Sequence, residues 1–393
     1  MNYFLKIIGL LFLFATQAVF AQTSVQFAEG KLDSALVRSK VEGKPVLLFC
    51  YASWCPHCKN MKEKVFSNVD VADFCNKHFI CVEQDMEKGE GVDLHKSFGI
   101  RSYPTFIFLN SSGEVLYRAA VEFTAPNFIA EAKNALNPDK QLPGLKKLFE
   151  SNVSKAGNCL IYMKALKKAD MDYSDMLKKY FDTQSDKQLL SEMNWTIIAN
   201  GTKEIDSREF QFVLSHKKEY ESIASPERVQ RKIFHLVKDL LNQQIDKNDT
   251  ANYFRSRQLA LKIRNVQVDS LIFTTDLSVY RINNKWEDYK KTAIQSVEKY
   301  VWSDNSILEN IAGDFFKNIT DTVALIQAVK WTKRSLSLNA GYDTYFLCAK
   351  LYRKINDFPN AVLSAKLAKQ EALKYDWDHS EADNLLKEMD QNK

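Results

Sequence analysis

The sequence predicts an α/β domain with a mixed sheet at the N-terminal end, followed by an all-α region of helical repeats. Strand-like and helix-like segments alternate from residue 25 to residue 137. Beyond that point strand-like alternation ends, and helical periodicity continues to Lys393. At 393 residues the chain is also too long for one typical domain.

Composition and charge exclude several classes of protein. Hydrophobic residues make up 45% and charged residues 26% of the chain, which are ordinary globular values that predict neither wholesale disorder nor many membrane spans. The net charge of +5 is spread along the chain without a dense basic block. We therefore expect no nucleic-acid partner.

The first 21 residues have the pattern of a secretory signal peptide. Lys6 precedes an unbroken apolar run over residues 7–14, and Val19-Phe20-Ala21 places small residues where a signal peptidase acts. The apolar run is short for a bilayer span of roughly 20 residues, which favours cleavage after Ala21 over a retained anchor. We expect a mature chain that begins at Gln22, is periplasmic or secreted, and has no stable membrane span.

The segments of the α/β domain, which we assign to residues 22–137, follow one another in a regular order. Pro56 stands near the first turn of one helix, where a missing N–H is tolerated. In chain order we expect a strand at Val25–Phe27, a helix at Leu32–Val41, a strand at Val46–Tyr51, helices at Lys59–Val65 and Val69–Lys77, a strand at Phe79–Glu83, a helix ending near Gly99, a hairpin of Thr105–Leu109 with Val115–Ala119, and a helix at Ala125–Leu136.

Two Pro-containing segments, Asn137-Pro138-Asp139 and Leu142-Pro143-Gly144, predict the boundary to the helical part. Residues 138–260 form a helical region with breaks at Asn200-Gly201 and Ser225-Pro226. Pro226 is well placed to open a long helix over Glu227–Gln243.

Residues 261–393 contain a weak repeat of small and aromatic residues. The same spacing of 3, 9, 4 and 3 residues recurs three times, with periods of 35 and 37 residues. It occurs at Leu277, Tyr280, Tyr289, Ala293 and Ser296, at Ala312, Phe315, Ala324, Ala328 and Trp331, and at Ala349, Tyr352, Ala361, Ala365 and Ala368. This pattern resembles tetratricopeptide (TPR) repeats, and an irregular helical bundle is the alternative.

Of the seven cysteines only Cys55 and Cys58 have a spacing with chemistry of its own. At a helix N-terminus the first sulfur, which we expect to be exposed, is favoured as a thiolate and attacks a disulfide, and the second then resolves the mixed disulfide. Half of a zinc site, with His57 and His78 recruited, is the less favoured alternative. We expect no metal and no cofactor. Cys50, Cys81, Cys159 and Cys348 lie in apolar segments and are expected to act as small hydrophobic residues. Cys75 is close enough in sequence to pair with Cys81, which is the less favoured alternative.

The segment from Lys44 to Lys59, KPVLLFCYASWCPHCK, resembles the thioredoxin family, and comes closest to the branch with the periplasmic C-terminal domain of DsbD. The similarity continues over Gly99–Phe106, GIRSYPTF, and covers about residues 25–137. It implies a thioredoxin fold in which Pro104 is a cis-proline facing the dithiol, and in which Trp54 and Tyr103 contact substrate.

Two residues depart from the family pattern. Phe49 occupies the position of a buried Asp that assists the resolving thiol, and Glu83 is either its substitute or a solvated residue at a strand end. The Pro56-His57 dipeptide resembles the strong oxidant DsbA, since a His beside Cys55 stabilises the thiolate. Both departures favour an oxidant or isomerase over a reductant, whereas the DsbD-like branch favours a reductant.

These observations predict an exported thiol–disulfide oxidoreductase, whether a protein-disulfide oxidase, isomerase or reductase. Its partners would be protein thiol or disulfide clients and a redox protein that resets the dithiol. The alternative is a helical-repeat scaffold that binds clients, with the thioredoxin-like domain as an accessory. A third interpretation is a dedicated partner of one exported protein, such as a cytochrome maturation client.

Overall fold

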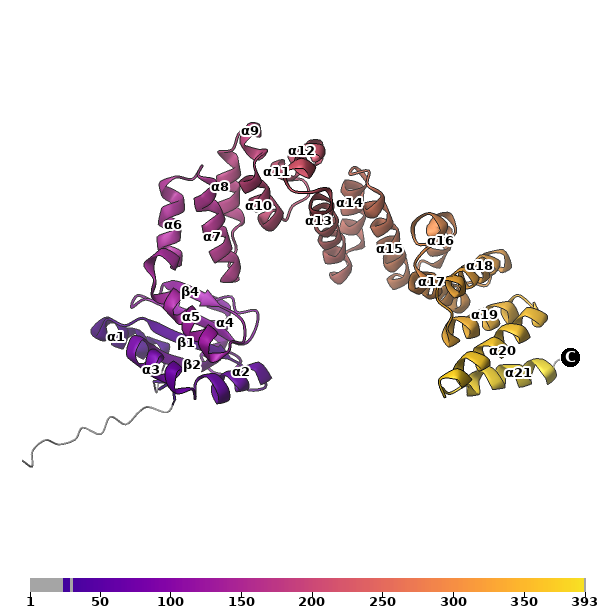
Figure 1. The fold of residues 1–393 in the computed structure, drawn as a ribbon, viewed down its shortest axis with the longest axis horizontal. Helices are drawn as coiled ribbons and strands as arrows, with labels where there is room; N and C mark the ends of the chain where they lie inside the picture. The colour runs from indigo at the N-terminus through magenta and orange to yellow at the C-terminus, as the bar shows by residue number, and fades with distance from the viewer. Residues whose placement is uncertain (1–23, 29–30, 392–393) are drawn as a thin grey trace, which may run out of the picture. The chain divides into compact units, whose positions relative to one another are not determined.

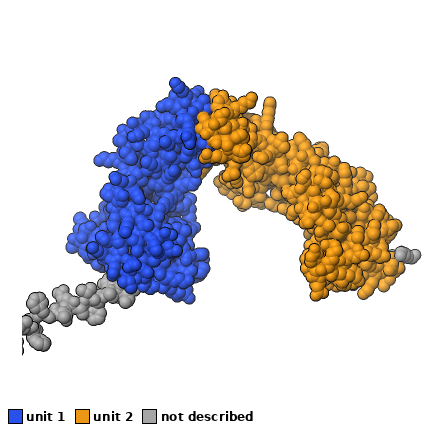
Figure 2. All heavy atoms as spheres, viewed as in Figure 1, with its two compact units in different colours: residues 1–202 blue, residues 203–393 orange. Residues whose placement is uncertain are grey.

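The computed structural model describes residues 24–28 and 31–391, and Figure 1 shows its elements in chain order. The chain divides into two compact units, one ending at Thr202 and the other beginning at Lys203 (Figure 2). The predicted signal peptide lies outside the described residues. Within the described residues, no helix combines the length and the apolar character that a bilayer crossing requires.

The first unit contains a mixed sheet of four strands in the order β2-β1-β3-β4. β1 (Val46–Tyr51) pairs in parallel with β2 (Ile80–Asp85) and antiparallel with β3 (Thr105–Leu109), which forms a hairpin with β4 (Val115–Ala119). The predicted strands from Val46 onward are confirmed. The predicted strand at Val25–Phe27 is wrong, because this segment makes one isolated bridge, between Phe27 and Cys81.

Alternation of side chains along the strands creates two cores, one on each face of the sheet. Leu47 and Phe49 of β1 join Phe106 of β3 on the face covered by α2 (Pro56–Asn60), α3 (Val69–His78) and α5 (Ala125–Leu136). Val46 and Leu48 belong to the other face, which α1 (Leu32–Glu42) and α4 (Gly91–Ser97) cover. Both faces are therefore buried, as expected of an α/β domain.

The helix predicted to begin near Pro56 and to run through Lys59–Val65 is present, but it changes type along its length. It starts at Pro56 as α2 and continues as a π-helix, η2 (Met61–Val65). Pro56 occupies the first turn, as expected. The extra residue in the π-helical turn has no signal in the hydrophobic pattern.

The predicted boundary at Leu142-Pro143-Gly144 is instead the first turn of a helix, α6 (Leu142–Ser151), which follows the 3₁₀ turn η3 (Pro138–Lys140). Pro143 is accommodated there because the first turn needs no N–H from it. The helix packs against β4 and η3. It therefore belongs to the same compact unit as the sheet.

The rest of the first unit is helical. It comprises α7 (Ala156–Lys168), α8 (Ser174–Asp182), α9 (Asp186–Leu189) and α10 (Glu192–Gly201). Asn200-Gly201, predicted as a turn, forms the end of α10. A Cβ at Gly201 would approach the side chains of Leu177 and Met163 to 2.6 and 2.7 Å, so this glycine is explained by close helix packing.

The second unit consists of helices that pack in pairs along the chain. They are α11 (Arg208–Ser215), α12 (Lys217–Ile223), α13 (Pro226–Asp246), α14 (Thr250–Leu261), α15 (Val266–Ile282), α16 (Trp286–Tyr300), α17 (Asn305–Asn318), α18 (Thr322–Leu338), α19 (Tyr342–Lys354), α20 (Phe358–Lys374) and α21 (Ser380–Gln391). Pro226 opens α13 as predicted. Small residues of the sequence repeat, such as Ala312, Ala349 and Ala365, are fully buried. Their assignment to TPR repeats stays a prediction.

Candidate redox site

The cysteine pair lies where β1 gives way to α2. Cys55 is the N-cap of this helix, with extended backbone angles, and Pro56 occupies the first turn. The Cys55 Sγ accepts a hydrogen bond from the Cys58 N–H at 3.3 Å. The Cys55 sulfur therefore lies at the end of a helix, where unpaired N–H groups and the helix dipole favour negative charge.

The loop before β3 covers Cys55 from the opposite side. The Tyr103–Pro104 peptide bond is cis, as the resemblance implies. The Cys55 thiol lies 3.7 Å from the Tyr103 carbonyl oxygen, within the hydrogen-bond range of sulfur. The buried Arg118 side chain holds the start of this loop by donating to the Phe98 and Gly99 carbonyls at 2.7 and 3.2 Å.

Cys55 is less accessible than the sequence predicted. Only 4% of Cys55 and 2% of Cys58 are exposed. The expectation of an exposed first cysteine is therefore wrong, because the Tyr103–Pro104 loop packs on the sulfur. What remains open to solvent is the rim, where Trp54 is 67% exposed.

The aromatic rim is formed by the two predicted substrate-binding residues. The Trp54 and Tyr103 rings meet edge to face with their centroids 6.1 Å apart. The Trp54 Nε1 donates to the Glu87 carboxylate at 2.8 Å, which fixes the indole on the surface. An exposed aromatic side chain offers apolar contact area to a binding partner. Contact of Trp54 and Tyr103 with substrate stays a prediction.

Lys62, which the sequence analysis did not single out, lies one turn beyond Cys58. Burial is the main effect that raises the pKa of the Cys58 thiol to about 12, and its hydrogen bond with Cys55 adds to this. A backbone hydrogen bond with Ala52 and, with a smaller effect, the positive charge of Lys62 act in the opposite direction and lower this pKa. Lys62 is therefore a nearby cation that favours the Cys58 thiolate, whose resolving role stays a prediction.

The surroundings of Lys62 show where Phe49 and Glu83, the two residues of the family departure, lie. Phe49 is fully buried, stacked on Phe106. Glu83, its neighbour on β2, forms an ion pair with the Lys62 ammonium at 2.7 Å, and that ammonium lies 3.8 Å from the centroid of the Tyr51 ring. Glu83 is thus a partner of Lys62 and is one step removed from the thiols.

His57 pairs with a residue distant in the sequence. Its Nδ1 lies 2.5 Å from the carboxylate of Glu122, in the segment between β4 and α5, and this hydrogen bond lowers the pKa of Glu122. The sequence offered no signal for Glu122, because the two residues are 65 positions apart. The effect of His57 on Cys55 stays a prediction.

The remaining cysteines are buried thiols. Burial raises the pKa of Cys50 and Cys348, and it raises that of Cys159 to about 12. The pKa of Cys81 is raised chiefly by a hydrogen bond with the neighbouring Cys75 thiol. These groups have the properties of small hydrophobic residues, as their apolar sequence contexts predict.

The zinc alternative gains no ligands from the described part of the chain. His57 is engaged by Glu122, and the His78 ring lies 4.7 Å from that of Phe74. Among residues 24–28 and 31–391, no group of three or more His, Cys, Asp or Glu side chains is arranged to hold a metal ion.

A segment outside the sheet domain contacts the loop that precedes Pro104. Arg101 in this loop forms an ion pair with Asp170, just after α7, at 3.3 Å. Asp170 has a positive φ of 51°, a conformation that Asp tolerates better than most residues. The helical part of the first unit thus supports the redox loop.

Comparison with known proteins agrees with this geometry. Residues 32–135 match the family described as "Thioredoxin-like domain". Residues 32–135 are a thioredoxin-like domain. The domain carries the Cys55–Cys58 pair at the N-terminus of α2, and a large helical region follows it.

Curated relatives of the thioredoxin-like domain include thiol:disulfide interchange proteins DsbD. The chain is 30% identical to the Vibrio cholerae protein over 112 residues, which are 27% of this chain and 18% of that protein. It is 33% identical to the Klebsiella pneumoniae protein over 107 residues, 26% of this chain and 17% of that protein. The chain therefore spans less than a fifth of the length of either relative.

A solved structure of a candidate disulphide isomerase from Bacteroides thetaiotaomicron is also similar. It is 41% identical in sequence, and the match covers 29% of this chain and 95% of that chain, with a TM-score of 0.28. The similarity to proteins named for thiol:disulfide interchange rests on the DsbD relatives.

Proposed function

We propose that this chain is an exported thiol–disulfide oxidoreductase that exchanges disulfides with protein clients through Cys55 and Cys58. The observation that carries the proposal is the position of Cys55. Its sulfur caps α2 by accepting the Cys58 N–H, and it lies beside the Tyr103 carbonyl under an aromatic rim. Export rests on the signal-peptide pattern of residues 1–21.

The exchange proceeds in two displacement steps. The Cys55 thiolate attacks one sulfur of a client disulfide, a mixed disulfide forms, and the second client sulfur leaves as a thiolate that takes up a proton. The Cys58 thiolate then attacks Cys55, which forms the Cys55–Cys58 disulfide and releases the first client sulfur. Two electrons pass from the dithiol to the client, and a dithiol redox partner resets the pair.

The same steps run in reverse oxidise a client dithiol. The direction follows from the reduction potential of the Cys55–Cys58 pair. A value near ~−120 mV places it among DsbA-like oxidants, and one near ~−270 mV among thioredoxin-like reductants. The Pro56-His57 dipeptide favours the oxidising end.

Two single variants of the full chain test the proposal. We expect Cys55→Ser to abolish disulfide exchange with a reduced or oxidised client protein, and Cys58→Ser to accumulate a mixed disulfide that non-reducing electrophoresis detects. Cys348→Ala, a buried cysteine in the other unit, is the matched control and should exchange at the parent rate. Undiminished exchange by Cys55→Ser would refute the proposal.

A scaffold that binds clients through its helices is the second candidate function. It is favoured by the observation that residues 203–393 form a compact unit with its own apolar cores. It predicts client binding by the full chain that survives Cys55→Ser. Loss of both exchange and client binding in that variant favours the oxidoreductase.

A further inference from the structure

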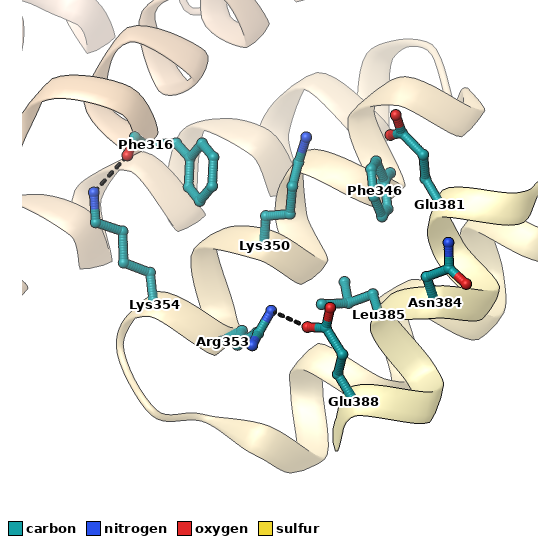
Figure 3. A pocket seen from close by; sticks show the side chains of 9 residues that line it. All are labelled: Phe316, Phe346, Lys350, Arg353, Lys354, Glu381, Asn384, Leu385 and Glu388. Atoms are coloured by element: carbon teal, nitrogen blue, oxygen red, sulfur yellow. Dashed lines mark hydrogen bonds and ion pairs between the residues drawn. The ribbon is translucent and has the colours of Figure 1, made fainter. Parts of the chain in front are cut away.

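The second unit contains a pocket of about 520 Å³ between three of its helices (Figure 3). The helices are α17, α19 and α21. The helices α17 and α19 each begin one helix pair, and α21 is the final helix. The lining residues are Phe316, Phe346, Lys350, Arg353, Lys354, Glu381, Asn384, Leu385 and Glu388. On α19 they recur at the spacing of one helix face.

Aromatic rings and ammonium groups meet in this pocket. The Lys350 Nζ lies 4.4 Å from the centroid of Phe346 and 5.4 Å from that of Phe316, and Figure 3 shows it between the two rings. The Lys354 Nζ lies 5.3 Å from the Phe316 ring and donates to the Phe316 carbonyl oxygen at 2.5 Å. Lys354 is half-buried, and burial lowers the pKa of its ammonium.

The charges in the pocket do not balance. Arg353 and Glu388 neutralise each other in an ion pair of 2.7 Å. In the part of the chain that the structure describes, neither Lys350 nor Lys354 has a carboxylate within ion-pair distance. Two half-buried cations therefore face one remaining acid, Glu381.

We propose that this pocket binds an acidic peptide segment of a partner protein. Its carboxylates would pair with Lys350 and Lys354, and an apolar side chain would contact Phe316 and Phe346. Charge complementarity favours an anion, since carboxylates gain charge-assisted contacts with ammonium groups that are partly removed from water. The inference does not depend on the dithiol, because the pocket lies entirely within the second unit.

The partial burial of the two lysines favours a peptide over an anionic membrane. The volume of about 520 Å³ is within the range of ligand-binding pockets, roughly 300–1,000 Å³. A membrane surface is contacted instead by exposed basic side chains, whereas Lys350 and Lys354 are half-buried beside rings.

A peptide titration of the full chain tests the proposal. The probes are two fluorescein-labelled hexapeptides, one of alternating glutamate and leucine and one of alternating lysine and leucine. Fluorescence anisotropy measures the binding of each. We expect the glutamate peptide alone to bind, less tightly as salt rises. The double variant Lys350→Gln, Lys354→Gln should weaken peptide binding about tenfold or more. The single variant Lys350→Gln should weaken it less, and it disturbs no hydrogen bond in the described structure.

Lys366→Gln, an exposed lysine on α20 outside the pocket, is the matched control and should bind like the parent. Lys350→Glu with Lys354→Glu should reverse the preference toward the lysine peptide. Unchanged affinity in the double glutamine variant overturns the proposal. The proposal is also overturned if the glutamate peptide does not bind and the two lysines are instead required for binding of phosphatidylserine vesicles. The same holds if they are required for self-association of the chain. These variants should exchange disulfides at the parent rate. Failure of the peptide-binding proposal would therefore be distinguishable from failure of the proposed oxidoreductase function.

Discussion

Lys62 acts on the resolving thiol through charge alone. Its ammonium is held by Glu83 and the Tyr51 ring, and it lies on the same helical face as Cys58 one turn away. A fixed cation beside a buried thiol favours the thiolate. Lys62 therefore favours the Cys58 thiolate by its charge and does not accept a proton from it.

We predict that Lys62→Met slows resolution of the mixed disulfide about 3- to 10-fold at neutral pH and low salt. Loss of the cation raises the pKa of Cys58 further, so less thiolate is present at any pH below that pKa. The rate of resolution should still rise with pH, but its profile should move to higher pH. Stopped-flow measurement of client release against pH checks this, with the difference shrinking as salt screens the charge.

Lys59→Met is the control for this prediction. Lys59 is an exposed lysine on the same helix and its closest carboxylate partner is Glu63, at 3.7 Å. It should leave the pH profile of resolution unchanged. Equal profiles for the parent and Lys62→Met would show that the cation does not influence Cys58.

At the scale of elements, α7 is bound to the thioredoxin-like domain by a polar cluster. The Lys168 ammonium contacts the Glu131 carboxylate of α5 at 2.6 Å and the Tyr117 hydroxyl of β4 at 2.7 Å. The Tyr117 hydroxyl also donates to Glu131. Burial alone would raise the pKa of Glu131, but the hydrogen bonds from Lys168 and Tyr117 outweigh burial and lower it.

We predict that Lys168→Met destabilises the first unit by about 1–3 kcal/mol at pH 7, because a largely buried carboxylate loses its cation. A carboxylate with a lowered pKa adds stability above its unfolded pKa of about 4.3, and that stability is lost as pH falls through the folded pKa. The difference between parent and variant in urea unfolding should therefore persist from pH 7 to about 5 and shrink below about 4.3.

Lys164→Met, an exposed lysine on the same helix, should unfold like the parent at every pH. If the difference in unfolding free energy between the parent and Lys168→Met does not change with pH, the destabilisation comes from lost packing of the lysine side chain. That result would contradict the role of the Glu131 charge.

The elements themselves were largely predictable, and the misses have local causes. β1, the β3–β4 hairpin and α5 appear where alternation, turn residues and helical periodicity place them. The segment at Val25–Phe27 has strand-like composition but only one backbone bridge. The π-helical turn at Met61–Val65 and the helix that begins at Leu142 depend on tertiary packing, which hydrophobic periodicity does not encode.

The candidate site was predictable where it lies in short motifs. Cys55, Cys58 and Trp54 lie in one motif, and Tyr103-Pro104 in another, and the structure brings the two together. Lys62 and Glu122 were missed because their meaning depends on contacts between segments far apart in the chain. The burial of Cys55 was missed for the same reason, since the loop that covers it lies 48 residues away.

At the scale of the molecule, the compact unit that carries the dithiol extends beyond the thioredoxin-like domain to Thr202. The apolar residues Leu142, Leu145 and Phe149 of α6 are buried in this unit. Lys168 and the Arg101–Asp170 ion pair add further contacts with the thioredoxin-like domain. We therefore expect residues 142–202 to contribute to the stability of this unit.

We predict that a fragment of residues 24–202 is more stable to urea than a fragment of residues 24–137, by about 2 kcal/mol or more, because the shorter one exposes apolar surface of β4 and loses the Lys168 contacts. Equilibrium unfolding followed by circular dichroism checks this. Equal midpoints and slopes for the two fragments would contradict this prediction and support the domain boundary at residue 137 that the sequence predicts.

The exposed indole of Trp54 has an optical consequence. Its ring lies on the rim of the dithiol, whereas Trp195 and Trp331 are fully buried elsewhere. A change in the charge or bonding of Cys55 alters the electric field and the quenching groups around one solvent-facing fluorophore. If the proposed exchange occurs at Cys55, we expect the emission of Trp54 to follow it in real time without a dye, once the emission of the exposed Trp377 is subtracted.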